Sequence, residues 1–133
     1  MHPYITDEYQ HLQQRCRLLA EDFATRAAQH DRDASHPSEN YAALRQAGLH
    51  CFNIPKNLGG WGMGLLPWTL AAEELAQGCP ATALSFNMHL SIIGPLMDSP
   101  LVSQATKERL ADLIVGHNKL VSGNFSEPTT SGL

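Results

Sequence analysis

The residues best suited to hold a small molecule stand together at the end of the chain. Residues 119–126 alternate apolar and polar side chains, with Val121 and Phe125 on one face, which predicts a β-strand. Pro128 ends this strand because proline has no N–H to give to a ladder. Residues 129–132 then supply hydroxyl and backbone N–H groups in a turn, a combination that suits the capture of a carbonyl or phosphate group.

This strand stands alone in the sequence, and a single strand does not make a sheet. Its unpaired edge would be open to pairing with another chain. We therefore expect either that it pairs with something outside this sequence, or that the sequence is a piece of a longer protein.

Upstream of the strand, the sequence predicts five helices, which must position the terminal turn. Periodic apolar residues and terminal Pro, Ser, Thr and Gly residues mark them. They are expected from a Thr6 cap to a charged exit at 29–35, from Pro37 to Gly48, from Pro67 to Gly78, from Pro80 to about Gly94, and from Ser99 and Pro100 to Gly116.

The fourth of these helices is apolar almost all round, so we expect it to be the central buried helix, broken at its end by Pro95. Asn87 and His89 lie within it. Two interpretations of this pair stay open: they are core polar groups with internal partners, or they border a ligand cavity, since buried polar groups are costly.

Two connectors complete the helical part. Residues 49–54 place apolar side chains at near-alternate positions and predict a short extended piece. Residues 59–64 contain four glycines, but their spacing does not complete the GxGxxG pattern of a dinucleotide loop. We expect this loop to be a structural connector whose Trp61 packs against the domain.

Composition and spacing exclude several classes of function. The net charge of −4, with only 9 scattered basic residues, is unlike a nucleic-acid-binding protein. The 7 histidines and 3 cysteines show no metal-ligand spacing, so no metal site and three reduced thiols are expected. The most apolar stretch, 81–97, is too short and interrupted to span a bilayer, and no signal peptide is visible, which predicts a cytoplasmic protein.

The remaining residues do not by themselves name a catalytic group. Glu73 and Glu74 are adjacent on a helix and point about 100° apart, so they cannot act together on one bond. No GxSxG elbow and no P-loop occurs. One or both carboxylates are expected to be solvated or ion-paired.

Six features in one order give the chain, from about Ala20 to Gly132, a resemblance to the N-terminal half of acyl-CoA dehydrogenases. They are the charged exit at 31–32 before 37–39 (PSE), 44–49 (LRQAGL), 54–62 (IPKNLGGWG), 73–76 (EELA), His89, and 126–128 (SEP) followed by small residues. The resemblance implies an FAD enzyme with a helical N-terminal domain, a middle β-domain and a C-terminal helical bundle. Residues 1–118 would then be an all-α up-and-down domain, and 119–133 the start of the β-domain.

The resemblance also implies roles for individual residues. Phe125 and Ser126 fall where the family contacts the flavin ring, and backbone N–H and hydroxyl groups suit the edge that gathers negative charge on reduction. Ser131 and Gly132 fall where cofactor and CoA are touched, although their order is reversed. Ser131 and His89 are the expected substrate-binding residues.

The family's catalytic glutamate lies downstream of this sequence, so no catalytic residue is assigned and this 133-residue chain alone is expected to be inactive. The implied partners are an acyl-CoA thioester, an electron acceptor, the β-domain and bundle, and further copies of the chain, since the family is usually tetrameric. Two alternatives stay open: a fragment of a flavin monooxygenase of the same fold, and a stand-alone helical interaction domain whose strand augments a partner's sheet.

Overall fold

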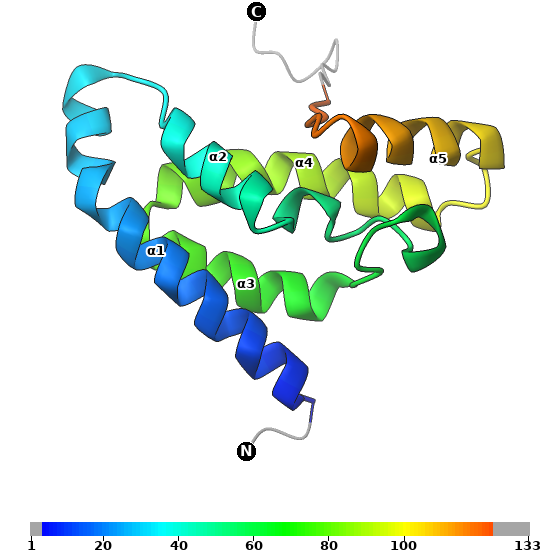
Figure 1. Cartoon of the computed structure of the whole chain (residues 1–133), viewed down its shortest axis with the longest axis horizontal. Coiled ribbons are helices and arrows are strands. Elements are labelled where there is room, and N and C mark those ends of the chain that lie inside the picture. Colours follow the sequence, from blue (N-terminus) through cyan, green and yellow to red (C-terminus); the bar gives the residue numbers. More distant parts are fainter. Residues whose placement is uncertain (1–3, 124–133) are drawn as a thin grey trace, which may run out of the picture.

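The computed structural model describes residues 4–123, and this part of the chain is all-α, as predicted (Figure 1). No β-strand occurs within it. Its elements are α1 (Asp7–Asp33), α2 (Ser38–Gln46), η1 (Leu49–Cys51), η2 (Lys56–Leu58), α3 (Leu65–Gly78), α4 (Pro80–Asp98), α5 (Gln104–Ala111) and η3 (Asp112–Gly116).

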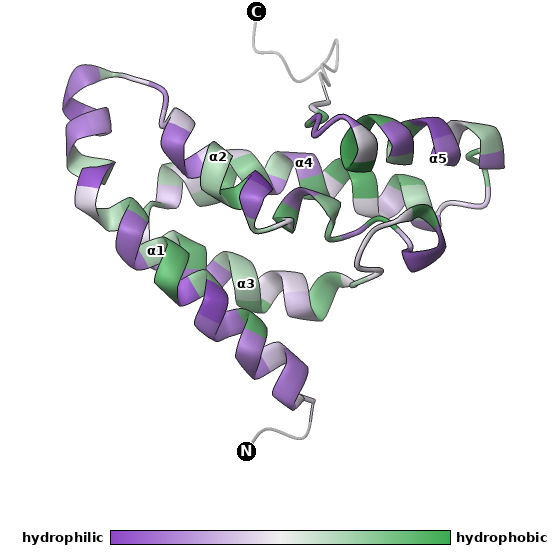
Figure 2. Ribbon diagram, in the orientation of Figure 1, coloured by the Kyte–Doolittle hydropathy of each residue, from purple (hydrophilic) through white to green (hydrophobic). Residues whose placement is uncertain are grey.

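Helix α1 begins where the sequence predicts. The side chain of Thr6 accepts a hydrogen bond of 3.3 Å from the N–H of Tyr9, and Asp7 and Glu8 lie in the first turn, where the helix dipole favours negative charge. The helix runs through the charged residues to Asp33, further than the sequence indicates, and ends at Ala34 in a left-handed conformation. Its polar residues face outward along most of its length (Figure 2).

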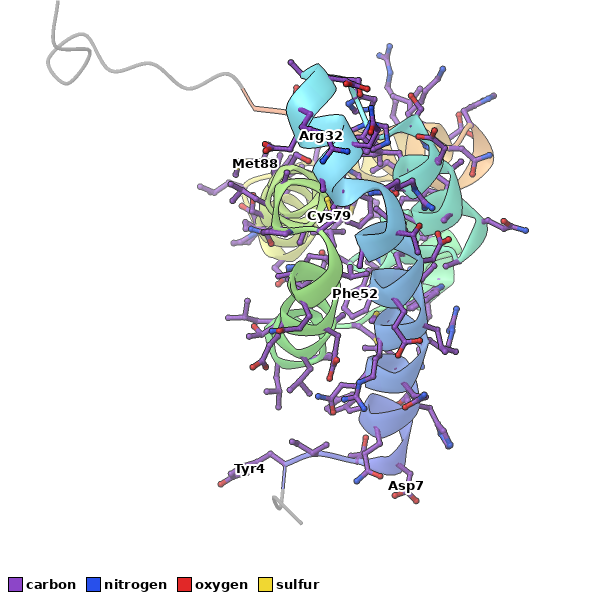
Figure 3. The ribbon with its side chains drawn as sticks, turned by 90° about the vertical axis from the view of Figure 1, so that its left-hand side faces the viewer. Tyr4, Asp7, Arg32, Phe52, Cys79 and Met88 are labelled. Carbon is purple, nitrogen blue, oxygen red and sulfur yellow. The ribbon has the colours of Figure 1, made fainter. Side chains whose placement is uncertain are left out.

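The main core forms where α1 and α3 pack along each other and α3 packs on α4. A second cluster joins the C-terminal half of α4 to η1 and η3. Phe52 lies in the middle of the molecule (Figure 3) and packs against two tryptophans, with its ring centroid 5.6 Å from that of Trp61 (tilted) and of Trp68 (edge-on). The prediction that Trp61 packs the glycine-rich loop against the domain is therefore confirmed.

The predicted extended piece at 49–54 is wrong. Gly48 stops α2 as expected, with a left-handed φ of 76°, but the chain then turns into the short 3-10 helix η1. Leu49, Phe52 and Ile54 are all buried there. Burial on more than one side of a tight turn gives the same near-alternate apolar pattern as a strand, so periodicity over six residues did not distinguish them.

Three predicted helix boundaries are also corrected. Helix α3 begins at Leu65, two residues before Pro67. Pro95 does not break α4, which continues to Asp98. Helix α5 begins at Gln104 with Ser103 as its cap, accepting from the N–H of Thr106 at 3.2 Å, rather than at Ser99 and Pro100.

The last correction concerns a residue that was assigned to the buried stripe of the fifth helix but is exposed. Leu101, assigned to the apolar stripe of the fifth helix, is 94% exposed and lies before that helix begins. The helix ends at Gly116 as predicted, although its last turn, η3, is a π-helix.

Residues 118–123 follow η3 without helix or strand. Leu120 packs against the main core and Val121 against the second cluster, whereas Ser122 is exposed. Residues 119–123 of the strand predicted over 119–126 are described and form no strand here, while 124–126 lie outside the described residues. The domain boundary at 118 stays a prediction.

Candidate functional site

Helix α4 has two apolar faces, and only one of them is buried. Phe86, Leu90 and Ile93 point into the core. On the other face Leu84 is 68% exposed and Met88 is 49% exposed, and Figure 3 places Met88 at the outer edge of the molecule. The helix predicted to be the central buried helix is thus buried on one face only, because its second apolar face has no cover within the described residues.

Two pockets meet along this uncovered face. One, of about 660 Å³, lies between α4 and the start of α3 and is lined by Leu65, Trp68 and the loop residues Gly62–Gly64. The other, of about 540 Å³, lies between α4 and residues 118–123, the exit segment that follows η3. It is lined by residues that include Met88, Ile92 and Ser122. Ser91 and Pro95 line both pockets, so the two spaces adjoin at the same turn of α4.

Pro95 gives this turn a polar character. A proline inside a helix has no N–H for the carbonyl four residues earlier, so Ser91 loses its usual helical donor there. The hydroxyl of Ser91 donates to the carbonyl of Met88 at 3.0 Å. Ser91 is thus the polar residue of the turn where the two pockets adjoin.

Asn53, which lines the larger pocket, has a buried side-chain acceptor with no partner among the described residues. Asn53 donates through Nδ2 to the carbonyl of Met63 at 2.9 Å, but its Oδ1 is buried without a hydrogen bond among the described residues. The nearby Trp68 donates through Nε1 to Oδ1 of Asn87 at 2.6 Å. For Asn87, the structure therefore favours the interpretation of a polar group with an internal partner.

His89 also has internal partners on both ring nitrogens. Its Nε2 lies 2.9 Å from the carbonyl oxygen of His50, and its Nδ1 accepts from the N–H of Val121 at 3.0 Å. Burial is the largest cause that lowers the pKa of His89, and it also lowers the pKa of His50. A substrate contact by His89 stays a prediction.

The other predicted site residues, Phe125, Ser126, Ser131 and Gly132, lie outside the described residues. The structure instead brings Trp68, Asn53, Ser91 and Pro95 to the pockets, and the sequence analysis did not single these out for a site. Pro95 within an apolar helix pattern was the signal available for this turn, and it was interpreted as a helix break.

The carboxylates and thiols behave as expected from their spacing. Glu74 forms a two-point ion pair with Arg17, at 2.8 and 3.1 Å, which leaves it no role beside Glu73. Cys16, Cys51 and Cys79 are free and buried. Over residues 4–123, no group of three or more metal-binding side chains is found, and no helix is long and apolar enough to cross a membrane.

The features described so far define a class of protein. It is an all-helical domain with an uncovered apolar helix face, two adjoining pockets and an exit segment beside them. Comparison with known proteins identifies it further. Residues 6–115 match the family model described as "Acyl-CoA dehydrogenase, N-terminal domain". The chain belongs to the acyl-CoA dehydrogenase family, and the resemblance stated from its motifs is confirmed.

Three relatives illustrate the family. YdbM of Bacillus subtilis (strain 168), named among the acyl-CoA dehydrogenases, is 34% identical over 90 residues, covering 68% of this chain and 24% of YdbM. The mitochondrial short-chain specific acyl-CoA dehydrogenase of Bos taurus is 30% identical over 95 residues, 70% of this chain and 23% of that protein. The 3-sulfinopropanoyl-CoA desulfinase of Variovorax paradoxus is 33% identical over 113 residues, 81% of this chain and 27% of that protein. The matched stretch thus spans about a quarter of each relative.

Proposed function

We propose that this chain is the helical domain of an FAD-dependent oxidoreductase that acts on the acyl part of a CoA thioester. The uncovered face of α4 carries the proposal, because an apolar stripe with two adjoining pockets suits an acyl chain. The names of the relatives support the substrate class: short-chain acyl-CoA and 3-sulfinopropanoyl-CoA are both CoA thioesters.

In this proposal the acyl group lies along Leu84, Met88 and Ser91. Oδ1 of Asn53, which has no partner among the described residues, suits a donor such as an amide N–H or a hydroxyl. A thioester carbonyl and a free carboxylate both only accept, so this acceptor does not distinguish the thioester from the free fatty acid.

The described residues also fit one face of a flavin. The pocket beside the exit segment combines the apolar side chains of Met88, Ile92 and Leu96 with the polar group of Ser122, which suits a flat ring with polar edges. FAD, when bound, supplies the oxidant that accepts two electrons from the substrate. Phe125 and Ser126 are the proposed ring contacts, and Ser131 and Gly132 are proposed to reach cofactor and substrate.

The catalytic base is not proposed among the residues of this chain. We propose that it belongs to a part of the complete enzyme downstream of Leu133, that the complete enzyme is a homo-oligomer, and that the 133-residue chain alone binds acyl groups without turnover. A desulfinase activity is the second candidate, because the match to the Variovorax desulfinase extends over more of this chain than the match to either dehydrogenase.

The substrate class can be tested on the chain itself. Trp68 lines the larger pocket, whereas Trp61 lines a separate pocket with Arg15. In a Trp61→Phe variant, indole fluorescence reports on Trp68 alone. Saturated acyl-CoA esters should change this fluorescence in a saturable way, and CoA without an acyl chain should not. No change with any ester would contradict the proposed acyl site.

The reaction class needs the protein at its natural length. We expect a flavin absorption spectrum that bleaches anaerobically when an acyl-CoA is added. A flavin that no acyl-CoA reduces, but whose chemically reduced form reacts with oxygen, would replace this proposal with the monooxygenase. Loss of the sulfino group from 3-sulfinopropanoyl-CoA without an electron acceptor would favour the desulfinase.

A further inference from the structure

The segment that leaves the helical domain is held by side chains from three separate elements. Arg45 of α2 donates through Nε to the carbonyl of Asn118 at 3.1 Å. His50 of η1 donates through Nε2 to Oδ1 of Asn118 at 3.0 Å. His89 of α4 accepts the N–H of Val121 at 3.0 Å. Asn118 itself takes a left-handed φ of 53°, which turns the chain at this point.

The partners of His89 determine its protonation. A backbone carbonyl can only accept, so Nε2 donates to His50 and carries the proton. A backbone N–H can only donate, so Nδ1 is bare and accepts from Val121. The imidazole, 2% exposed, is therefore the neutral Nε2–H tautomer, and each nitrogen fixes the role of the other.

This arrangement has a consequence for the chain beyond it. The N–H of Val121 is used by a helix side chain, so it is not available to a β-ladder. If the predicted strand pairs with another strand, its hydrogen bonds on the side of the Val121 N–H can come only from residues after Val121. The side chain of Val121 is packed against the second cluster and Ser122 is exposed, so the two residues point to opposite sides.

We propose that His89 is a positioning residue, which holds Val121 through Nδ1 and so sets where, and in which register, the chain runs on toward the flavin-contacting residues. Its role for the flavin rests on the function proposed above, because Ser126 lies five residues after Val121. His89 acts through the backbone, and the acyl chain need not touch it.

The hydrogen bond from the N–H of Val121 to Nδ1 of His89 is weakened by acid. Protonation of Nδ1 turns the acceptor into a donor, and the N–H of Val121 then loses its partner. Burial is the largest cause that lowers the pKa of His89; the hydrogen bond to the carbonyl of His50 raises it in part, and the charges of His50 of η1 and Arg45 of α2 lower it. The pKa of His89 is thus lowered, so the contact is present at neutral pH and is lost as the pH falls through that lowered pKa.

Three variants separate the two hydrogen bonds. His89→Asn keeps an acceptor close to the position of Nδ1 and cannot titrate near neutral pH. His89→Gln keeps a donor close to the position of Nε2 and so retains the bond to His50. His89→Phe removes both. The direct measurement is amide hydrogen exchange of Val121 by NMR in the 133-residue chain, as a protection factor that corrects for the intrinsic effect of pH.

We expect Val121 to be protected about tenfold more in the wild type than in His89→Gln or His89→Phe, the effect of one hydrogen bond. Protection should decline with acidification in the wild type and stay constant in His89→Asn. Imidazole nitrogen shifts should show protonated Nε2 and bare Nδ1. Equal exchange in wild type and His89→Gln, the opposite tautomer, or the same pH dependence in His89→Asn would overturn the proposal.

The flavin role is tested at natural length by the rate of FAD release. His89→Gln should release FAD severalfold faster than the wild type, and His89→Asn should restore retention at acidic pH. Unchanged release in His89→Gln, together with lost protection of Val121, would overturn the positioning role and leave the proposed function intact. A wild-type protein that binds no flavin would overturn the proposed function, while the exchange data would still decide the contact between His89 and Val121.

Discussion

Gly78, the last residue of α3, is the position where one methyl group should disturb this fold most. A Cβ built there would lie 1.9 Å from the carbonyl oxygen of Ala20 in α1, 2.5 Å from its carbonyl carbon and 2.6 Å from its Cα. All three are backbone atoms, so no side-chain rotation can relieve the clash. Helices α1 and α3 must separate locally by about 1.5 Å before ordinary van der Waals contact is restored.

The cost can be estimated from the packing that this separation disturbs. Helices α1 and α3 form the most extensive helix pair of the domain, with Cys16, Ala20 and Leu75 buried. Overpacking of a well-packed interior costs about 1–3 kcal/mol, and a backbone clash belongs at the upper end. With an unfolding entropy of about 2.1 cal/mol/K per residue, 3 kcal/mol lowers the Tm of a 133-residue chain by about 11 °C.

The assay is thermal unfolding of Gly78→Ala followed by circular dichroism, with Gly94→Ala as the matched control. Gly94 lies inside α4, and a Cβ there meets only the side chain of Asn53, at 3.6 Å. Alanine is about 1 kcal/mol better than glycine in a helix interior, so the control should raise Tm by about 3 °C. A Gly78→Ala chain that melts within about 2 °C of the wild type would refute the close approach of α1 and α3, whereas opposite shifts would support it.

Three further predictions concern buried and exposed side chains. Asn40→Ala should cost about 2 kcal/mol by chemical denaturation, because the fully buried Asn40 donates to Thr82 at 2.8 Å and accepts from Nε of Arg26 at 2.7 Å, and both bonds are lost. A cost under about 0.5 kcal/mol would contradict this. In the same assay, Ile93→Ala should lower the free energy of unfolding by about 2–5 kcal/mol, because Ile93 is buried. Leu84→Gln should lower it by less than about 0.5 kcal/mol, because Leu84 is exposed on the same helix. Equal costs would mean that α4 is oriented differently. Burial raises the pKa of Cys16 to about 12, so iodoacetamide at pH 8 should label this thiol only after denaturation. Peptide mass spectrometry measures the labelling, and rapid labelling of the folded chain would show that the thiol is accessible.

Much of the helical framework could be predicted from the sequence, because the relevant signals are local. Thr6 accepts from a backbone N–H three residues later, and Gly48 supplies the left-handed residue that ends a helix. Such interactions involve neighbours in the chain, so residue type and spacing suffice. The family could be identified for a related reason: its motifs keep their order along the chain whatever their contacts.

The errors arose where distant packing overrides a local preference. Proline disfavours a helix interior, yet α4 passes through Pro95, with its buried stripe extending beyond it to Met97. The lost hydrogen bond is local, while the packing of Met97 against Ile114 and Ala111 involves residues far along the chain. Sequence periodicity cannot weigh one against the other.

The candidate site divides in the same way. The sequence by itself determined the family, an all-α domain and a terminal motif with the chemistry of a flavin contact. Only the tertiary structure decided which face of α4 is left uncovered, that Asn53 and Ser91 line the larger of its pockets, and that His89 holds Val121. Those properties depend on which distant residues occupy the space around a side chain, because a buried and an uncovered apolar face have the same composition until the fold places a neighbour against one of them.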